Sequence, residues 1–342
     1  MNNFPGLFDY ENRMEKLSQT RSGLDRLNSL MDWEMFRSAL VEIVKKESKG
    51  PGGRPRRDVV LMFKVLVLQR IYNLSDEQTE YQINDRLSFQ KFLGITLSDP
   101  APDQKTIWLF REDMGRNGGV EKLFSRFDRH LSEQGIMGRE GKIVDASFVE
   151  VPRQRNSRED NQTIKSGGVP DSFAKNKHCL RQKDVDARWT KKNEEPYYGY
   201  KNHLKADQRT KLIAKYEVTD ASVHDSQALE SLVEAGDKVL YADSAYRSEK
   251  ISSLLEAKGI ANRIHEKGYR NHPLTEEQKA SNTEKSRVRA RVEHVFGQMT
   301  HAMNEGLYLQ YIGLKRIIAG VGLLNLTYNM IRYEQIRRLA LI

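Results

Sequence analysis

The stretch that decides the fold is Lys142-Ile143-Val144-Asp145-Ala146-Ser147-Phe148-Val149. It is a short run of apolar and β-branched residues, which favours a strand, with a single carboxylate inside it. Aspartate is depleted in strands, and burying its charge without a partner costs several kcal/mol. We therefore expect a bound cation, a partner group or a position at the strand end to compensate Asp145.

Two further stretches carry carboxylates in comparable settings. The run Val239-Leu240-Tyr241-Ala242-Asp243-Ser244-Ala245-Tyr246 has the same build. Glu293 lies in Arg287-Val288-Arg289-Ala290-Arg291-Val292-Glu293-His294, whose pattern indicates a helix. Two strand-borne aspartates and one helix-borne glutamate, in a basic chain, predict a site for divalent metal that acts on phosphodiesters.

The positive charge of the chain is unevenly distributed. The 342 residues contain 56 basic and 47 acidic side chains, a formal net charge of +9. Residues 1–140 contain 22 basic and 21 acidic side chains, so residues 141–342 contain 34 and 26 and hold +8 of the excess. The half with the three carboxylates therefore favours a polyanionic partner. The charge and the aromatic content of 8% disfavour glycoside hydrolysis by paired carboxylates.

Cysteine usage and apolar runs point to an intracellular location. The single cysteine, Cys179, excludes an internal disulfide and, with only His178 beside it, predicts no zinc site. The first ten residues lack the basic and apolar segments of a signal peptide. The longest apolar stretch, 317–331, is interrupted by Asn325 and Asn329, so no membrane span is predicted.

Residues 1–137 show the apolar spacing of about six short helices. Helix starts are predicted at Asp58, at the capping box Ser75-Asp76-Glu77-Gln78 and at Asp103. Segment 49–57 is a Gly/Pro-rich basic loop that either reaches phosphates or is a solvated linker; its arginines are Arg54, Arg56 and Arg57. An N-terminal all-α domain for DNA binding or dimerisation is expected, with a purely structural helical domain as the alternative.

Residues 138–339 predict a second, α/β domain. Segment 152–195 is polar and basic, and we expect a mobile or nucleic-acid-facing insertion there, with Arg153, Arg155 and Arg158 as DNA contacts. Around it, three strands in a meander are followed by helix, strand, helix, strand and helix. This order resembles the ribonuclease H-like fold, a mixed five-stranded sheet with flanking helices. The predicted segments after 142–149 are strands at 198–206, 211–218, 239–246 and 260–265 and helices at 226–235, 248–258, 287–299 and 315–339.

In that fold the first and fourth strands are neighbours, so Asp145 and Asp243 converge although 98 residues separate them. Carboxylates, phosphate oxygens and waters suit Mg²⁺, and two such ions could serve both the attacking and the leaving oxygen. Glu293 lies at the edge of an apolar helical stripe, where its side chain can enter a cleft. Arg289 shares that face, and an ordinary surface salt bridge with Glu293 is the alternative. Glu284 is the next candidate for a third carboxylate.

The three blocks Val144–Ser147, Tyr241–Tyr246 and Arg287–Phe296 resemble the catalytic blocks of DDE transposases from bacterial insertion sequences, with the insertion sequence five family most similar. Segments Val218–Ser226 and Gly322–Asn329 and the tripeptide Gly53-Arg54-Pro55 continue the likeness. The resemblance covers residues from about 30 to 335, apart from the polar insertion.

The resemblance implies metal-dependent cleavage of transposon ends and strand transfer to target DNA, with Asp145, Asp243 and Glu293 as catalytic, metal-binding triad. It implies Mg²⁺, with Mn²⁺ as a substitute, and a homodimer or higher oligomer on terminal inverted repeats in a cytoplasmic, nucleoid-associated setting. A decayed transposase that only binds DNA, or a stand-alone nuclease of this fold, are the alternatives.

One departure concerns the family signature Tyr-x2-Arg-x3-Glu-x6-Lys. Arg289 and Glu293 match it, but Ser286 and Thr300 replace the tyrosine and the lysine, which leaves Arg287 and His301 as substitutes. Further DNA contacts are expected from Arg289, Arg287 and Arg247. Active-site support is expected from His224, Tyr246 and His294, although Asp225 or Ser226 could simply cap the helix that follows His224 and Tyr246 could belong to the core. Trp189, among basic residues, is a candidate for stacking on bases.

Overall fold

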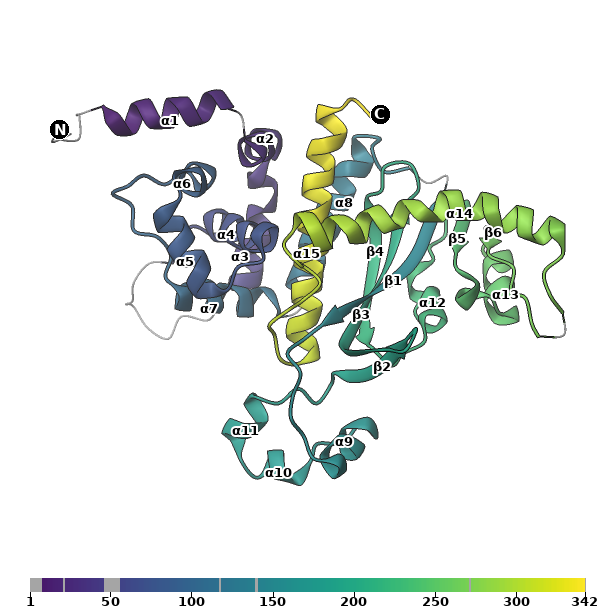
Figure 1. Cartoon of the computed structure of the whole chain (residues 1–342). Coiled ribbons are helices and arrows are strands. Elements are labelled where there is room, and N and C mark those ends of the chain that lie inside the picture. Colours follow the sequence, from purple (N-terminus) through teal and green to yellow (C-terminus); the bar gives the residue numbers. More distant parts are fainter. Residues whose placement is uncertain are drawn as a thin grey trace.

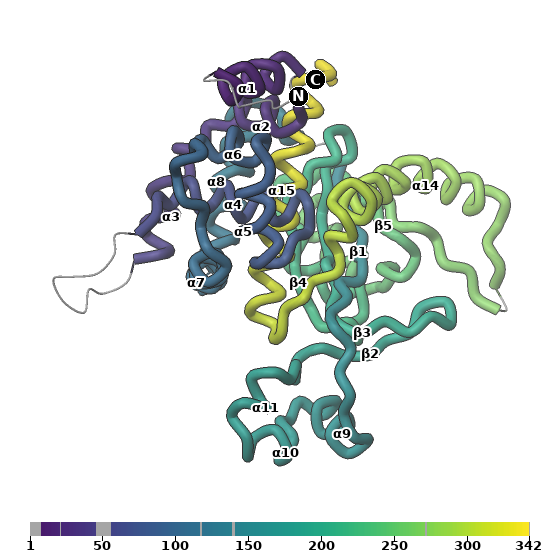
Figure 2. The backbone as a smooth tube through the Cα atoms, turned by 60° about the vertical axis from the view of Figure 1, so that its left-hand side comes forward, coloured from purple at the N-terminus to yellow at the C-terminus, as the bar shows by residue number. Residues whose placement is uncertain are grey.

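The computed structural model describes residues 8–20, 22–45, 56–116, 118–138, 141–270 and 272–341. A group of short helices from the N-terminal part of the chain lies beside a mixed β-sheet (Figure 1). A long helix, α14, crosses one end of that sheet, and the small helices α9 to α11 project beyond it in both views (Figures 1 and 2). The fold is α/β and consistent with the predicted ribonuclease H-like class.

The helices before the sheet begin where local sequence predicts. Asp58 accepts hydrogen bonds from the amides of Val60 and Leu61 at 2.9 and 3.0 Å, and Asp103 accepts one from Thr106 at 2.8 Å. Ser75 and Gln78 form the predicted capping box. The helices of this part are α1 (Asp9–Thr20), α2 (Gly23–Leu30), η1 (Trp33–Phe36), α3 (Arg37–Val44), α4 (Val59–Tyr72), α5 (Asp76–Asp85), α6 (Leu87–Leu93), α7 (Gln104–Met114) and α8 (Gly119–Glu133).

The sheet has six strands, so the prediction of five strands is wrong by one. The strand order is β2-β3-β1-β5-β6, and β4 also pairs with β3. The additional strand is β2, which lies inside the segment 152–195 that its polar composition had set apart. The strands are β1 (Lys142–Glu150), β2 (Arg188–Lys192), β3 (Glu195–Asp207), β4 (Ile213–Asp220), β5 (Val239–Ala242) and β6 (Ala261–Ile264).

The central strand β1 has two different neighbours. It runs antiparallel to β3 along its whole length, with Asp145 opposite Leu204. It runs parallel to β5, which pairs only with the start of β1, Lys142 opposite Leu240 and Ile143 opposite Tyr241. Because β5 is the fourth of the strands predicted from sequence, the expected adjacency of first and fourth strands is confirmed.

The insertion at 152–195 is folded, contrary to the expectation of a mobile segment without packed residues. It contains α9 (Arg158–Lys165), α10 (Asp171–Ala174) and α11 (Lys177–Arg181), and Ile164 and Phe173 are buried. Two of its carboxylates also cap the N-terminus of α15. Asp184 accepts the Gly313 amide and Asp186 the Leu314 amide, each at 3.0 Å. These bonds attach the insertion to the rest of the protein.

The helices after β4 pack on the sheet. The predicted helix at 226–235 is shorter and divided, because a 3₁₀ turn, η2 (Asp225–Gln227), precedes the single turn α12 (Leu229–Leu232). The 22-residue α14 places Val292 and Val295 in the core as predicted, and the π-helical turn η4 continues it. The remaining elements are η3 (Ser244–Tyr246), α13 (Glu249–Ala257), α14 (Glu276–Gly297), η4 (Gln298–Ala302) and α15 (Leu314–Arg338).

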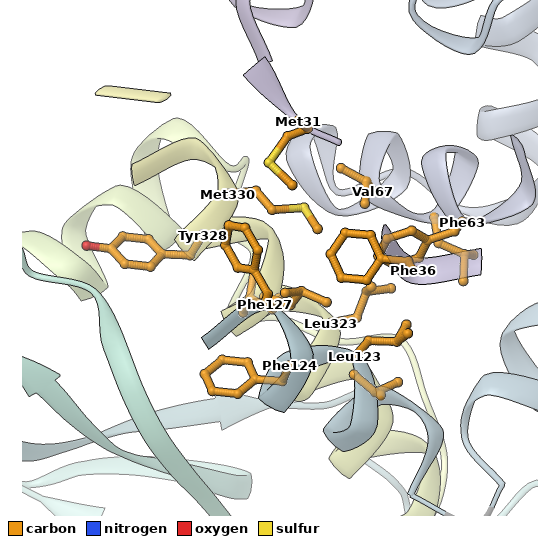
Figure 3. Packing of buried hydrophobic residues seen from close by; sticks show 14 of the residues in the cluster. Met31, Phe36, Phe63, Val67, Leu123, Phe124, Phe127, Leu323, Tyr328 and Met330 are labelled. Atoms are coloured by element: carbon orange, nitrogen blue, oxygen red, sulfur yellow. The ribbon is translucent and has the colours of Figure 1, made fainter. Parts of the chain in front are cut away.

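The largest hydrophobic core joins the two predicted domains. Helix α15, near the end of the chain, packs on α2, α4 and α8 as well as on β4. Figure 3 shows this packing, with Phe36 and Phe63 from the N-terminal helices, Phe127 from α8 and Leu323 and Met330 from α15. Each such buried side chain contributes about 1.5–3 kcal/mol. The N-terminal helices therefore share a core with the C-terminal helix. No helix among the described residues has the length and apolar character needed to cross a membrane.

Candidate active site

Two aspartates meet where β5 ends beside β1. The last parallel pair is Ile143 with Tyr241; two residues further on, Asp145 lies within β1, and Asp243 directly follows β5 as the N-cap of η3, because the predicted strand 239–246 ends at Ala242. Residues two apart on a strand face the same side, and neighbouring strands are about 4.8 Å apart. The shared register therefore brings the two carboxylates to one edge of the site.

Helix α14 brings Glu293 and Arg289 to the same place. The Arg289 Nη1 lies 2.9 Å from Asp145 Oδ2, and its Nη2 lies 3.8 Å from Glu293 Oε1. The side chain of Glu293 is 66% exposed, whereas that of Arg289 is 25% exposed. The short contact of Arg289 is therefore with a strand aspartate, and an isolated surface pair with Glu293 does not describe it.

The environments of the two aspartates push their pKa values in opposite directions. Burial raises the pKa of Asp145, against the opposing effects of the Ala146 amide and the positive charges of Arg289 and Lys192. Partial burial also acts to raise the pKa of Asp243, but hydrogen bonds from Ala245 and Ser244 and nearby positive charge bring it below its usual range. Separated pKa values within one site are typical of functional carboxylates.

The free oxygens at this edge suit a hard cation. Asp243 Oδ1 accepts the Ala245 amide and the Ser244 hydroxyl, both at 3.0 Å, and Asp145 Oδ1 accepts the Ala146 amide at 2.8 Å. Asp243 thus keeps its second oxygen for a cation, whereas the second oxygen of Asp145 accepts a hydrogen bond from the Arg289 guanidinium. Among the described residues no three His, Cys, Asp or Glu side chains already stand close enough together to hold a metal. The donor chemistry fits a divalent metal once Arg289 moves from Asp145.

Tyr246 is buried beside the carboxylates. Only 1% of it is exposed, and its hydroxyl has no hydrogen-bond partner among the described residues. Burial, together with the charges of Asp145, Asp225 and Asp243, raises its pKa well above the usual value. The prediction that Tyr246 packs in the core is confirmed, and its hydroxyl lies at the site as well.

Sequence reasoning missed three residues near this edge. Asp225 forms a 2.8 Å ion pair with Lys201, whose side chain is 12% exposed. His265 follows β6, and its Nε2 lies 3.3 Å from the Ser286 hydroxyl on α14. The available signal for His265 was its place after the strand that neighbours β5. Ser286, where the family signature has tyrosine, therefore contacts a histidine at the rim of the site.

The two histidines proposed as support are exposed. His224 itself caps η2, accepting the Ser226 amide and contacting its hydroxyl at 2.7 Å, so the interpretation of Asp225 or Ser226 as the cap is wrong. His294 follows Glu293 on the solvent side of α14. Thr300, the second departure from the signature, uses its hydroxyl within η4, bonding the Phe296 carbonyl at 3.0 Å. His301 is exposed.

The candidate DNA-contacting arginines fall into two groups. In one, the guanidinium already has a partner: Arg56 bonds the Val44 carbonyl, Arg57 the Ala101 carbonyl at 2.9 Å and Arg247 the Glu266 carboxylate at 2.6 Å. In the other, Arg287 is exposed on α14, and the contacts of Arg153 are longer, 4.0 Å to the Glu150 carboxylate and 5.5 Å to the centroid of the Trp189 ring. Arg155 and Arg158 are on the exposed insertion, and Arg54 lies outside the described residues. DNA contact by these arginines stays a prediction.

A mixed sheet with one carboxylate on its central strand and another at the end of the neighbouring strand, and a helix that presents a third carboxylate, is typical of a ribonuclease H-like domain. Residues 137–330 match the family model described as Transposase DDE domain, and residues 11–113 match the model described as Transposase domain (DUF772). The chain belongs to the DDE transposases. It is a DNA-binding enzyme that performs transposition through divalent-metal-dependent DNA cleavage and strand transfer.

Among solved structures, a piggyBac transposase synaptic complex with hairpin DNA is a distant likeness. The TM-score is 0.45 and the sequence identity 12%, over 93% of this chain and 75% of the other.

Proposed function

We propose that Asp145, Asp243 and Glu293 form the catalytic, metal-binding triad of this transposase. The observation that carries the proposal is the register of β1 and β5, which places Asp145 on β1 beside Asp243 at the end of β5, with Arg289 joining Asp145 to the Glu293 side of α14. DNA binding alone gives no reason to gather three anions in the more basic half of the chain. Their presence favours an active enzyme over a decayed transposase that only binds DNA.

The second oxygens of Asp145 and Asp243, with Glu293, would hold Mg²⁺, or Mn²⁺ in its place, and two ions would be shared with DNA phosphates. Bound there, the metal would activate the attacking oxygen and stabilise the leaving one in phosphodiester displacement. The protein's own part is to fix both aspartates on rigid strands and to orient the scissile phosphate.

Arg289 would act as the counter-ion of Asp145 before the reaction. A guanidinium at 2.9 Å stabilises a buried carboxylate whose pKa burial raises. With Asp145 engaged by a cation, the N–H donors of Arg289 would be available to a DNA phosphate. Arg287, two residues away and exposed, would contact the neighbouring backbone.

The wider assignment follows the resemblance to the insertion sequence five family. The DNA would be the terminal inverted repeats of an insertion sequence and its target, bound by a homodimer or higher oligomer at the bacterial nucleoid in the cytoplasm. The helices of residues 1–137 would bind DNA or mediate dimerisation, and residues 138–339 would carry the chemistry. Arg54, Arg56, Arg57, Arg153, Arg155, Arg158 and Arg247 would add phosphate contacts.

The test is strand transfer of a pre-cut transposon end, taken from DNA that flanks the gene, by purified protein in Mg²⁺ or Mn²⁺. Wild-type protein should join the end to target DNA, and this result separates a transposase from a stand-alone nuclease, which only cuts. Glu293→Gln should abolish joining and should gain less melting temperature from Mn²⁺ than wild type. If this variant keeps both, the third carboxylate must be sought elsewhere, with Glu284 first.

Arg289→Ala is the matched control on the same helix face. It should keep the Mn²⁺-dependent rise in melting temperature, because it removes no oxygen ligand, and it should bind transposon-end DNA more weakly. Loss of the Mn²⁺ response in both variants would show that the effect belongs to the helix and not to the carboxylate.

A further inference from the structure

Arg70, in the last turn of α4, is a buried arginine without a hydrogen-bonded partner. Only 4% of it is exposed, and neither its Nε nor its Nη1 has a hydrogen-bond partner among the described residues. Its guanidinium carbon lies 5.6 Å from the centroid of the Tyr311 ring. Burying an unpaired guanidinium is costly, and a contact with an aromatic ring offsets only part of that cost. An anion beside Arg70 would offset the rest.

Arg70 lines a cavity of about 180 Å³. The cavity lies between the turn that joins α4 to α5 and the segment that leads into α15. Its volume has room for a tetrahedral oxyanion and a few waters. Three of its lining residues, Ser75, Gln78 and Tyr308, are exposed, so an anion can enter the cavity from solvent.

A second arginine at the cavity, Arg111, already has an anion. Both of its terminal nitrogens contact the Asp76 carboxylate, with Nη2 2.8 Å from Oδ2. Asp76 Oδ1 also accepts a hydrogen bond from the Gln69 amide at 2.8 Å. The charges of Arg111 and Asp76 compensate each other, and the other lining residues apart from Arg70 are neutral. The cavity therefore keeps one uncompensated positive charge, that of Arg70.

Neutral donors accompany this charge. The Tyr311 hydroxyl is buried and has no partner among the described residues. Ser75 and Asp76, at the N-terminus of the ten-residue helix α5, also line the cavity, and the first amides of a helix have no intrahelical acceptors. A guanidinium, a phenol hydroxyl and a helix N-terminus are the donors that suit a phosphate group.

The walls of the cavity are joined without a ligand. Asn73, in the turn after α4, has a φ of 46° and donates to the carbonyls of Asn304 and Glu305 at 2.7 and 3.2 Å. Further along the same segment, Tyr308 pairs with Glu150 at the end of β1. The cavity thus lies where the N-terminal helices meet the central strand of the sheet, and a group bound there would contact both parts of the chain.

We propose that the Arg70 cavity is a phosphate-binding site, separate from the carboxylates and independent of metal. A bound phosphate group would supply the counter-ion that Arg70 lacks and would join α4 and α5 to the segment before α15. The same chemistry serves a phosphate of the DNA backbone and free inorganic phosphate. Neither source involves the triad proposed above.

The first measurement uses inorganic phosphate with the full chain in EDTA, and sodium chloride at equal ionic strength is the reference. Phosphate should raise the Tm of wild type above its value in chloride, and calorimetry gives the Kd. Arg70→Met should weaken phosphate binding about tenfold or more, because it removes a charged donor. In chloride it should melt no lower than wild type, since the charge that it removes is buried and unpaired.

Two further variants control this result. Tyr311→Phe removes only the hydroxyl and keeps the ring beside Arg70, so it should fold as wild type and bind phosphate more weakly. Arg86→Met is the matched control, because Arg86 also lies over two rings, 5.7 Å from the centroid of Tyr72 and 5.2 Å from that of Phe89, but is exposed. It should bind phosphate as wild type does.

Duplex DNA decides the source of the phosphate group. If a backbone phosphate occupies the cavity, Arg70→Met should reduce the slope of log affinity against log salt by about 0.9, whereas Arg86→Met should leave it unchanged. Loss of phosphate binding in Arg70→Met with an unchanged slope would assign the cavity to free phosphate.

Two outcomes would overturn the proposal. One is a wild-type Tm that phosphate raises no further than chloride does. The other is phosphate affinity in Arg70→Met and Tyr311→Phe equal to that of wild type, which would leave Arg70 a purely structural role on the Tyr311 ring. Asp145→Asn changes the triad alone and should bind phosphate as wild type does, so failure of the triad and failure of this cavity are distinguishable.

Discussion

Buried polar groups differ between the α15 interface and the strand ends that hold the carboxylates. On α15, Asn325 exchanges hydrogen bonds with Asn202 of β3 at 2.9 and 3.2 Å, and Asn329 bonds both the amide and the carbonyl of Ile213 at 2.8 and 2.7 Å. At the strand ends, the Tyr246 hydroxyl and Arg289 Nε have no partner among the described residues.

This difference in hydrogen bonding reflects the different roles of the two regions. A paired group in an interface fixes one geometry, whereas an unpaired group beside a reactive site is available to a ligand. The interface has exceptions among the described residues: the hydroxyls of Thr327, of Tyr216 beside Gly322 and of Tyr311 beside Gly320 are buried and unpaired. At the site, Asp145 has Arg289 as its hydrogen-bonded side-chain partner, so replacing that partner with a cation would change the site and leave the sheet in place.

The largest expected effect is at the site. Asp145→Asn and Asp243→Asn should each reduce DNA cleavage by two orders of magnitude or more (~100-fold), because a missing metal ligand removes stabilisation worth several kcal/mol at the transition state. Both variants should fold, as circular dichroism would show. Cleavage within tenfold of wild type in a gel assay would break the contrast between the two regions.

The next effect belongs to the α15 interface. Asn329→Leu leaves the buried amide and carbonyl of Ile213 without partners and should lower the free energy of unfolding by about 2–4 kcal/mol in a urea titration. Its control is the Asn202/Asn325 pair. Asn325→Leu alone should be more destabilising than the double change to leucine, because the double change removes both polar partners. Equal destabilisation by the single and the double change would mean that these amides serve packing only.

A buried carboxylate away from the site, Asp128, should make the stability of the fold depend on pH. Burial raises the pKa of Asp128, on α8, to about 6, and its Oδ1 has no partner among the described residues. The folded protein thus binds this proton more tightly than the unfolded chain, whose aspartate pKa is about 3.9, so stability falls as pH rises from about 4 to about 6. Asp128→Asn should be more stable than wild type at pH 7 by about 1–2 kcal/mol and equal to it near pH 3.5. Melting curves of both proteins, measured between pH 3.5 and pH 7, test this prediction.

The smallest effect per residue concerns the insertion. Removing the charges of Arg153, Arg155 and Arg158 together should flatten the dependence of log affinity on log salt by about 0.9 for each DNA phosphate that the variant no longer neutralises. Affinity for duplex DNA, measured from low to moderate salt, gives the slope. An unchanged slope would mean that the insertion does not contact DNA. Its role would then be structural, through the two side chains that cap α15.

Local sequence predicted the features that depend on near neighbours. The caps at Asp58, Ser75 and Asp103 and the buried stripe of α14 are short-range patterns, and the structure contains them. Alternation of apolar residues also located β1, β3 and β4. Strand β2 was missed because Arg188 to Lys192 is basic and polar, and only pairing with β3 makes it a strand.

By itself, the sequence determined which carboxylates stand on strands and on a helix, since an aspartate inside an apolar run is conspicuous wherever the chain places it. Tertiary structure alone decided that Arg289 pairs with Asp145, that Tyr246 is buried beside three carboxylates, and that Asn325 and Asn329 pair with the sheet. These interactions join residues that are far apart in the chain or depend on which face a strand presents. Their energies come from desolvation and from the distance between partners, and no local pattern records either.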